Sequence, residues 1–364
     1  MKIGIVTLYL DNNNYGANLQ SYALSRVISD MGETAKHIKY YNGTRTRRIL
    51  SKIKTFLINF GHINFNKRIH KIKQFRDSIP HSPTFFHSNI KKINAFFDVL
   101  IVGSDQVWNP NSINDFYMLN FAEKNKVKIS YAASIGKNSL SFTQTSLYKD
   151  FLSDYQAISI REKEGVDFIK NLGYENAQLC LDPTLLLSKL EWDEICSKRL
   201  ISEKYVFCYF LSENVLERKN AKEFARKRGL KIVTLPHLAY KKRQCDVSFG
   251  DHQLYNVSPQ DFISLIKYSE CVFTDSFHAT VFSLIYEKQF FSFDDCKTET
   301  SSRITTLLKI FNAEKHFVNK IGDMNLNHIE SVDQIIYSNN NEFDSLKQLS
   351  LSFLKRSIKN DKNL

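Results

Sequence analysis

The sequence predicts an α/β protein with two Rossmann-like parallel-sheet domains that face each other across a cleft. Three observations lead to this fold class. Strand-like and helix-like segments alternate along the chain in two series, and such alternation is typical of parallel sheets. Some strand-like segments, such as 97–102, are apolar almost throughout, as expected of strands buried on both faces. With 364 residues, the chain is also too long for one small core.

The first series of elements fills the N-terminal half. Its expected strands lie at 2–8, 97–102, 128–134, 157–160 and 178–181, and its expected helices at 17–31 and 162–172. The second of these helices is followed by Gly173, which suits a C-terminal cap. Asp182-Pro183 stops the last strand. The N-terminal domain is therefore expected to span 1–187, with the boundary near Pro183 to Trp192.

The second series repeats this pattern. Its expected strands lie at 205–211, 230–235, 271–273 and 289–293, and its expected helices at 215–228, 258–269 and 302–311. Ser258-Pro259 marks a helix start, with serine as the N-cap and proline at the first helical position. The C-terminal domain is expected at 188–335, and a last helix occupies 336–364, roughly from Asn341 to Ile358.

Composition narrows the class of protein. The hydrophobic content of 43% is ordinary for a soluble globular protein, and no run of 18 apolar residues predicts a membrane-spanning helix. The six cysteines form no C-x-x-C pair, and Cys180, Cys208 and Cys271 lie in apolar strand-like runs. They are expected to be buried thiols in a reducing compartment, so the predicted location is the cytoplasm.

The net charge of +12 is uneven, because Thr44 to Arg76 contains ten Lys/Arg residues and no acidic residue. Apolar residues fall at helical spacing within this segment, at Ile49, Leu50, Ile53, Phe56, Leu57 and Phe60. Arg47, Arg48, Lys52 and Lys54 lie between them. Such a basic amphipathic insertion at 44–76 suits an anionic membrane surface or an acidic lipid-linked substrate. A helix packed on its own domain with a solvated basic face is the other reading. No zinc-finger spacing, RNP signature or clear helix-turn-helix supports nucleic acid as the partner.

The turn around His278 is the most informative motif. His278 follows the apolar strand 271–273 and precedes an apolar helix, so it stands at a strand-to-helix turn. Asp275 or Ser276 can cap that helix, and its first N–H groups attract anions. A histidine there can exchange a proton near neutral pH. The alternative is that Asp275 and Ser276 only cap the helix and His278 packs in its first turn.

Three further clusters stand at the expected carboxyl ends of strands. After the strand at 97–102, Asp105 can accept a proton or a sugar hydroxyl, and Trp108 can stack on a sugar ring. After the strand at 157–160, Arg161 can grip a carboxylate or phosphate with two donors, or form a salt bridge within the fold. Arg303 supplies a second cation downstream of His278.

The third cluster follows the opening strand. Gly16 permits a tight turn there, and Asn18 and Gln20 offer amide groups to a polar ligand, with Tyr15 beside them. A structural turn with a capping asparagine is the alternative. The chain carries no nucleotide-binding G-x-x-x-x-G-K-[ST] or G-x-G-x-x-G motif and no clustered set of metal ligands, so no metal is expected.

These motifs together resemble the polysaccharide pyruvyl transferase family. The resemblance rests on NYGANLQ at 14–20, GSDQVWNP at 103–110, YAASIG at 131–136, SIREKEG at 159–165, LDPTLLL at 181–187 with Trp192, TDSFHATVFSLIYEKQFF at 274–291 and SSRITTLL at 301–308. It runs in order from about residue 1 to 312, and the last 50 residues or so carry none of its motifs.

The resemblance implies a fold like that of the GT-B glycosyltransferases, with an acceptor-side N-terminal domain and a donor-side C-terminal domain. It implies transfer of pyruvate from phosphoenolpyruvate to two hydroxyls of a sugar as a cyclic ketal, during synthesis of a surface or capsular polysaccharide. Phosphoenolpyruvate is then the co-substrate, and no cofactor is required. A histidine matching His278 and an arginine matching Arg161 belong to the donor site. Some members carry a basic residue two positions before that histidine, where this chain has Ser276, so donor charge falls more heavily on Arg161 and Arg303.

On this interpretation His278 is the proton-transfer residue, and Asp105 orients or deprotonates the acceptor. Arg161, Arg303, Asp275 and Ser276 line the donor site, while Tyr15, Gly16, Asn18, Gln20 and Trp108 bind the acceptor, a lipid-linked sugar or oligosaccharide. The basic segment adds an expected attachment to the inner face of the plasma membrane. Two rival functions are a GT-B glycosyltransferase that uses a nucleotide sugar, and a non-catalytic membrane-surface component of a polysaccharide assembly complex.

Overall fold

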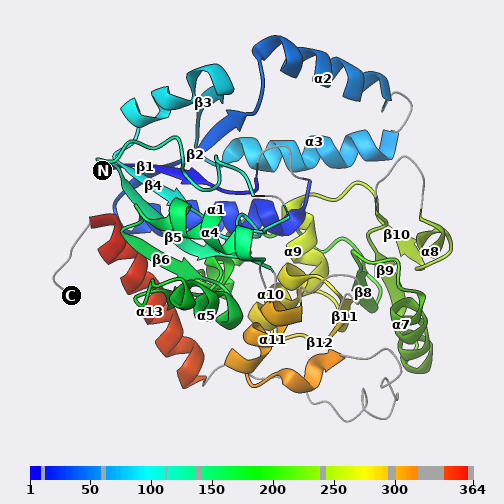
Figure 1. Ribbon diagram of the computed structural model, residues 1–364. Helices are drawn as coiled ribbons and strands as arrows, with labels where there is room; N and C mark the ends of the chain where they lie inside the picture. The colour runs from blue at the N-terminus through cyan, green and yellow to red at the C-terminus, as the bar shows by residue number, and fades with distance from the viewer. Residues whose placement is uncertain are drawn as a thin grey trace. The chain divides into compact units, whose positions relative to one another are not determined.

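The computed structural model describes residues 1–9, 13–58, 63–111, 113–136, 141–237, 243–293, 301–318 and 340–359. The chain divides into two compact units, which are described here separately (Figure 1). Unit 1 consists of Met1–Ile63, Lys73–Leu187 and Asp344–Leu364, and unit 2 consists of Asn64–Ile72 and Ser188–Phe343. The boundary expected at 335/336 lies outside the described residues.

Unit 1 is built on a seven-stranded sheet with the order β3-β2-β1-β4-β5-β6-β7, in which all neighbouring strands run parallel. Its strands are β1 (Lys2–Val6), β2 (Thr34–Tyr41), β3 (His81–Phe86), β4 (Val99–Val102), β5 (Val127–Ala133), β6 (Ala157–Ile160) and β7 (Gln178–Leu179). Its helical segments are α1 (Tyr15–Asp30), α2 (Arg45–Ile58), part of α3 (Ile63–Ser78), η1 (His87–Ala95), α4 (Phe142–Leu152), α5 (Lys163–Asn171), η2 (Pro183–Leu185) and most of α13 (Asn341–Lys359).

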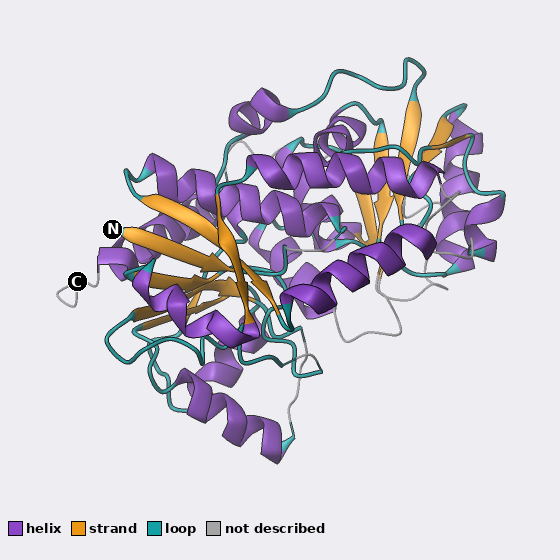
Figure 2. Cartoon of the chain, turned by 90° about the horizontal axis from the view of Figure 1, so that it is seen from above, coloured by secondary structure: helices purple, strands orange, loops and turns teal. Residues whose placement is uncertain are grey.

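Unit 2 repeats the design with a six-stranded parallel sheet in the order β10-β9-β8-β11-β12-β13. Its strands are β8 (Tyr205–Tyr209), β9 (Lys231–Thr234), β10 (His252–Gln253), β11 (Cys271–Thr274), β12 (Gln289–Phe293) and β13 (Phe317–Val318). Its helical segments include α6 (Lys189–Ile195), α7 (Val215–Arg228), α8 (Gln244–Val247), α9 (Pro259–Lys267), α10 (Phe277–Ile285), α11 (Ser301–Ile310) and η3 (Glu314–His316). The prediction of two parallel-sheet α/β domains is confirmed, and the purple helices in Figure 2 flank the orange strands.

Burial on both faces explains why the central strands are apolar. All four residues of β4 (Val99–Val102) and all five of β8 (Tyr205–Tyr209) are buried. The core of unit 2 is rich in phenylalanine, because Phe224, Phe273 and Phe291 have ring centroids 5.2–6.2 Å apart. Aromatic pairs at such separations add to the free energy gained from burial alone.

Local signals set the helix ends as expected. The side chain of Ser258 accepts a hydrogen bond from the Asp261 N–H at the start of α9, and Pro259 occupies its first turn. Helix α7 ends at Gly229, whose φ of 62° lies in the left-handed region that glycine adopts without strain.

The C-terminal helix packs on unit 1, although it follows unit 2 in the chain. The hydroxyl of Ser350 accepts a hydrogen bond from the Leu181 N–H at 3.0 Å. The ring of Phe353 lies 6.5 Å from the ring of Tyr131, and Leu354 and Ile358 are buried. The helix thereby packs against the segment that follows β7 and against Tyr131 of β5.

The basic segment expected as one amphipathic stretch forms two helices, α2 and α3. Arg68 on α3 is 7% exposed and donates three hydrogen bonds to carbonyls of unit 2, from Nε to Tyr255 O, from Nη1 to Pro236 O and from Nη2 to Leu254 O. These carbonyls follow strands β9 and β10. The guanidinium group of Arg68 thus donates to backbone carbonyls that have no partner in the sheet.

Cys180, Cys208 and Cys271 are buried, as expected. Burial raises the pKa of the Cys180 thiol to about 12, so it stays protonated at neutral pH. Among the described residues, no helix combines the length and the apolar character that a transmembrane span requires.

His37 on β2 offers a test of the packing between strand and helix in unit 1. Its side chain has no exposed surface, and Nε2 lies 3.0 Å from the Ser21 carbonyl of α1. Burial lowers the pKa of His37 from 6.5 to about 4, although the hydrogen bond to Ser21 acts in the opposite direction.

We expect the folded protein to lose about 3 kcal/mol of stability as pH falls from 6.5 to 4, because the unfolded chain takes up the His37 proton first. Urea unfolding at several pH values measures this, and the loss stops below pH 4, where both states are protonated. His37→Gln keeps an N–H donor for Ser21 but does not titrate, so its pH dependence should be flatter by this amount. Parallel profiles for the two proteins would contradict the assignment.

Candidate active site

Four polar residues meet at the carboxyl ends of strands in unit 1, and we call them the Arg161 cluster: Ser104, Asp105, Arg161 and Asp182. Nη1 of Arg161 lies 2.7 Å from Oδ2 of Asp182, and Nη2 lies 3.7 Å from Oδ1 of Asp105. The Ser104 hydroxyl donates to the same Asp182 oxygen at 2.8 Å. The Arg161 and Asp182 side chains are 2% and 0% exposed, so this ion pair is largely shielded from water.

Asp105 is the most exposed acid of the cluster, with 16% of its side chain accessible. Its φ of 77° lies in the left-handed region, which non-glycine residues seldom adopt. The backbone around it is held in place, because the Asp105 carbonyl accepts the N–H groups of Val107 and Ser134. Strain of this kind tends to mark functional positions, so Asp105 stays a candidate for contact with substrate.

Glu162 is a buried acid to which the sequence analysis gave no role. Its Oε1 accepts hydrogen bonds from the Ser134 hydroxyl and from the N–H groups of Ile135 and Gly136. Its Oε2 and the side-chain nitrogen of Gln106 are both buried, and neither has a partner among the described residues. The signal was present in the sequence, since Glu162 directly follows Arg161 at a strand end.

The four residues expected to bind the acceptor after β1 are buried in unit 1. Tyr15 is 2% exposed, Asn18 and Gln20 are fully buried, and Gly16 is buried as well. The Asn18 amide donates to Asn14 O, and the Gln20 amide donates to Thr7 Oγ1, Ala17 O and Ser21 Oγ. The alternative of a structural turn with a capping asparagine fits these contacts, because Asn14 caps α1. A direct sugar contact does not fit them.

Trp108 also departs from its expected role. It has no exposed surface, and its indole N–H donates to Tyr117 O at 3.2 Å. Its ring packs edge-on against Tyr155 at 5.7 Å. A fully buried ring has no face available to stack on a sugar, so Trp108 is a core residue.

The second set of candidates lies in unit 2 around the first turn of α10, and we call Ser276, Phe277, His278 and Arg303 the His278 cluster. His278 is 6% exposed and lies in the first turn of α10. Arg303 comes from the first turn of α11, and its guanidinium carbon lies 6.0 Å from the Phe277 ring centroid. Cation–π contact thus places a cation beside the residue that precedes His278.

Asp275 and Ser276 differ from expectation in detail. The Asp275 carboxylate accepts the N–H groups of Leu211 and Ser212, each at 2.7 Å, so it fixes the loop after β8. A carboxylate bound in this way would repel an anionic donor, and a donor-binding role for Asp275 is not supported. Ser276 is the N-cap residue of α10, but its side chain makes no capping hydrogen bond.

Both clusters stand where parallel sheets place ligands. In unit 1, Asp105 follows β4, which pairs with β1 at the point where the strand order reverses. In unit 2, Ser276 and His278 follow β11, which pairs with β8 at the corresponding point. Ligands of doubly wound folds bind outside the carboxyl ends at this switch point.

Comparison with known proteins identifies the family. The sequence profile of the polysaccharide pyruvyl transferase family matches residues 14–296. The chain belongs to the polysaccharide pyruvyl transferase family. It is accordingly a transferase. No curated protein matches the sequence.

Several solved structures have the same type of fold as this member of the pyruvyl transferase family. A Listeria monocytogenes protein provisionally named as a UDP-N-acetylglucosamine 2-epimerase has a TM-score of 0.60 at 11% identity, over 100% of this chain and 96% of its own. The Neisseria meningitidis UDP-GlcNAc 2-epimerase bound to UDP-GlcNAc scores 0.53 at 12% identity, over 99% and 100%. The Methanocaldococcus jannaschii enzyme scores 0.54 at 12% identity, over 96% and 99%. At these identities the likeness shows the GT-B type of fold alone.

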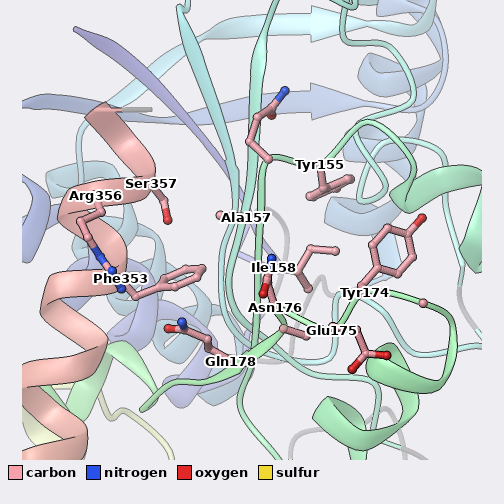
Figure 3. Close-up of a pocket in the computed structure, with 13 residues that line it drawn as sticks. Tyr155, Ala157, Ile158, Tyr174, Glu175, Asn176, Gln178, Phe353, Arg356 and Ser357 are labelled. Carbon is pink, nitrogen blue, oxygen red and sulfur yellow. The ribbon is translucent and has the colours of Figure 1, made fainter. Parts of the chain in front are cut away.

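A hollow of about 770 Å³ in unit 1 lies away from these residues. It is lined by residues that precede β6 and β7, such as Tyr155 and Tyr174, and by Phe353 and Arg356 of α13 (Figure 3). This is the amino end of the strands, whereas Arg161 follows β6 at the carboxyl end. We therefore do not assign the chemistry of the family to this hollow. Within the described ranges, no group of three or more His, Cys, Asp or Glu residues is arranged to hold a metal ion.

The buried Arg161–Asp182 pair generates a stability prediction. Asp182→Asn keeps the shape of the side chain but leaves the Arg161 charge without its closest counter-ion, so we expect a loss of about 3–5 kcal/mol in urea unfolding. Asp167→Asn is the matched control, because Asp167 pairs with Lys163 at an exposed site and its loss should stay below about 1 kcal/mol. Equal losses in the two variants would show that burial of the Arg161 pair has no special weight.

Proposed function

We propose that this protein transfers the pyruvyl group of phosphoenolpyruvate to two hydroxyls of one sugar residue, forming a cyclic ketal. In the reaction the methylene carbon gains a proton and the adjacent carbon becomes electrophilic. Two bonds to sugar oxygens form at that carbon, and its bond to the phosphate oxygen breaks. Of the two hydroxyl protons released, one balances the proton taken up by the methylene and the other leaves with phosphate.

The observation that carries the proposal is the position of His278 within the family match. The histidine lies in the first turn of α10, at the switch point of the unit 2 sheet. Helix starts present N–H groups to anions, and a phosphoenolpyruvate bound there would bring its phosphate and carboxylate to the imidazole. We assign His278 as the general acid that protonates the methylene carbon.

Charge neutralisation of the donor is assigned first to Arg303. It lies in the first turn of α11 and contacts Phe277, the residue before His278. Its planar fork suits two-point binding of a phosphate or carboxylate. Ser276 contributes a hydroxyl that does not cap α10.

Arg161 enters the proposal in a changed role. Its charge is balanced by Asp182 at 2.7 Å, so a direct grip on the donor would have to compete with this ion pair. Its second nitrogen faces Asp105 at 3.7 Å. We propose that Arg161 positions Asp105, and that Asp105 orients or deprotonates the attacking hydroxyl.

The acceptor is proposed to be a lipid-linked sugar or an oligosaccharide of a surface or capsular polysaccharide, modified in the cytoplasm. The family match supports a polysaccharide product. Phosphoenolpyruvate is the co-substrate of the proposal, and no step assigned to these residues calls for a further cofactor.

Replacement of His278 tests the catalytic assignment. His278→Ala should lower turnover by about 10²–10⁴-fold, the usual contribution of a general acid, while the melting temperature stays close to that of the wild type. Phosphate release, together with a mass gain of one pyruvyl group on the acceptor, reports the reaction. The control is His252→Ala, which removes a partly exposed histidine of unit 2 hydrogen-bonded to Glu203. A loss below about tenfold in His278→Ala, or a similar loss in both variants, would count against the role.

Donor identity is tested by thermal shift, because a ligand at 100 times its Kd stabilises the folded state by about 2.7 kcal/mol. We expect phosphoenolpyruvate to raise the melting temperature and UDP-GlcNAc to leave it unchanged. The opposite result would favour a nucleotide-sugar glycosyltransferase. No shift with either ligand, together with no turnover, would favour the non-catalytic component of an assembly complex.

A further inference from the structure

Helix α2 carries an apolar face that is exposed to solvent. Ile49, Leu50 and Ile53 are 51%, 61% and 50% exposed, although isoleucine and leucine are among the residues most often buried. Ile49 and Ile53 are four residues apart, and Leu50 and Ile53 are three apart, so the three side chains share one face. Lys52, Phe56 and Leu57 belong to the same sequence pattern, but their side chains, like Phe60, lie outside the described part of the structure.

A different face of α2 contacts the rest of unit 1. Arg48 is half-buried, and its guanidinium carbon lies 5.7 Å from the ring centroid of Tyr41 in β2. At about 100° per residue, Arg48 is rotated by roughly 100–200° about the helix axis from Ile49, Leu50 and Ile53. The contact with Tyr41 therefore turns the apolar face away from the strand.

Exposed cations flank the apolar face. Arg45, Arg47 and Lys54 are exposed, and the segment from Thr44 to Arg76 contains no acidic residue. No acidic side chain of this segment can therefore neutralise these cations. Exposed isoleucine and leucine framed by arginine and lysine are typical of helices that lie in the plane of a membrane interface.

Charge complementarity selects one occupant for this face. A second copy of the chain would bring a second ring of cations against the first, and the repulsion would oppose self-association through α2. A nucleic acid would neutralise the cations but would leave the apolar side chains without a partner. An anionic lipid surface satisfies both, because lipid phosphates meet the cations and the boundary of the acyl chains receives the apolar side chains.

We propose that α2 docks on an anionic lipid surface, with Ile49, Leu50 and Ile53 inserted at the headgroup boundary and Arg45, Arg47 and Lys54 facing lipid phosphates. The proposal is independent of pyruvyl transfer, because it concerns only α2 and requires no substrate. Its consequence is that the protein works at a bilayer surface.

Sedimentation with vesicles tests the contribution of charge. We expect the full-length protein to bind phosphatidylcholine–phosphatidylglycerol vesicles (3:1) and to bind pure phosphatidylcholine weakly. Replacing Arg45, Arg47 and Lys54 together by glutamine should lower the partition coefficient about 100-fold, because each basic residue near such a surface contributes about fivefold. The effect should shrink in 1 M salt, where the Debye length is only about 3 Å.

A matched variant controls for the loss of net charge. Lys219→Gln, Arg226→Gln and Lys227→Gln together remove the same three charges from exposed positions of α7, a helix that also carries Glu217 and Glu223. This variant should bind vesicles nearly as well as the wild type. If it loses as much binding as the α2 variant, net charge alone explains the attraction and the proposal fails.

Insertion of the apolar face has its own readout. The two native tryptophans, Trp108 and Trp192, are fully buried, so Leu50→Trp adds a single exposed reporter. Its emission should shift to the blue on anionic vesicles and be quenched by brominated lipid. In an otherwise wild-type protein, Ile49→Asn, Leu50→Asn and Ile53→Asn together should abolish sedimentation with vesicles while far-UV circular dichroism is kept.

Three results would overturn the proposal. The triple asparagine variant could bind anionic vesicles as well as the wild type, or Leu50→Trp could show no spectral shift on vesicles that sediment with the protein. Light scattering without lipid could also show that the asparagine variant converts a dimer to a monomer, which would make α2 a contact between copies. Activity on a short soluble acceptor should be unchanged in all α2 variants, so a failed docking test leaves the pyruvyl transfer proposal unaffected.

Discussion

The parallel pairing of every strand in both sheets is the constraint on which the rest of the structure depends. Strands that are buried on both faces cannot hold polar side chains in their interiors without partners, and β4 and β8 are buried along their whole length. Because parallel strands all point the same way, the polar residues that follow them collect at one edge. Ser104, Asp105 and Arg161 meet there in unit 1, and Ser276 and His278 stand at the equivalent edge of unit 2.

The two units use this edge differently. In unit 1 the charged groups at this edge have partners within the unit, since Arg161 pairs with Asp182 and Glu162 is bound by a hydroxyl and two backbone N–H groups. In unit 2 the acid at the edge, Asp275, is engaged by two N–H groups and faces its own loop. His278 and Arg303 lie in the first turns of α10 and α11, and Arg303 contacts Phe277, the residue before His278. This difference between the units is the physical reason why we propose the anionic donor for unit 2 and the acceptor hydroxyl for Asp105.

The sequence predicted the central elements better than the edges. The expected strand at 157–160 and the expected helix at 215–228 agree with β6 and α7. Apolar residues repeat along such elements wherever one or both faces are buried, and cap residues mark the helix ends, so both can be predicted from the sequence. Strand β2 and the edge strands β3, β10 and β13 were not predicted, since partial exposure weakens the apolar signal and β10 and β13 have only two residues each. For the site, the order of residues in the chain was enough to predict which residues follow a strand. It was not enough to predict whether their side chains are exposed, because Trp108 and Gln20 are both fully buried.

The basic segment places its arginines in two different environments, a buried one on α3 and an exposed one on α2. Arg68 on α3 is buried, and its charge is met by three backbone carbonyls, each an acceptor dipole that β9 or β10 leaves at its end. Removing such an arginine would leave buried carbonyls without donors, which is costly for folding. On α2, by contrast, Arg45 and Arg47 are exposed beside exposed isoleucine and leucine, so they contribute little to the folded state. The exposed apolar side chains bury only part of their surface, so they also add less to stability than buried ones would. Helix α2 thus combines exposed cations and exposed apolar side chains that folding does not require, and this combination is the physical basis of the proposed docking on a lipid surface.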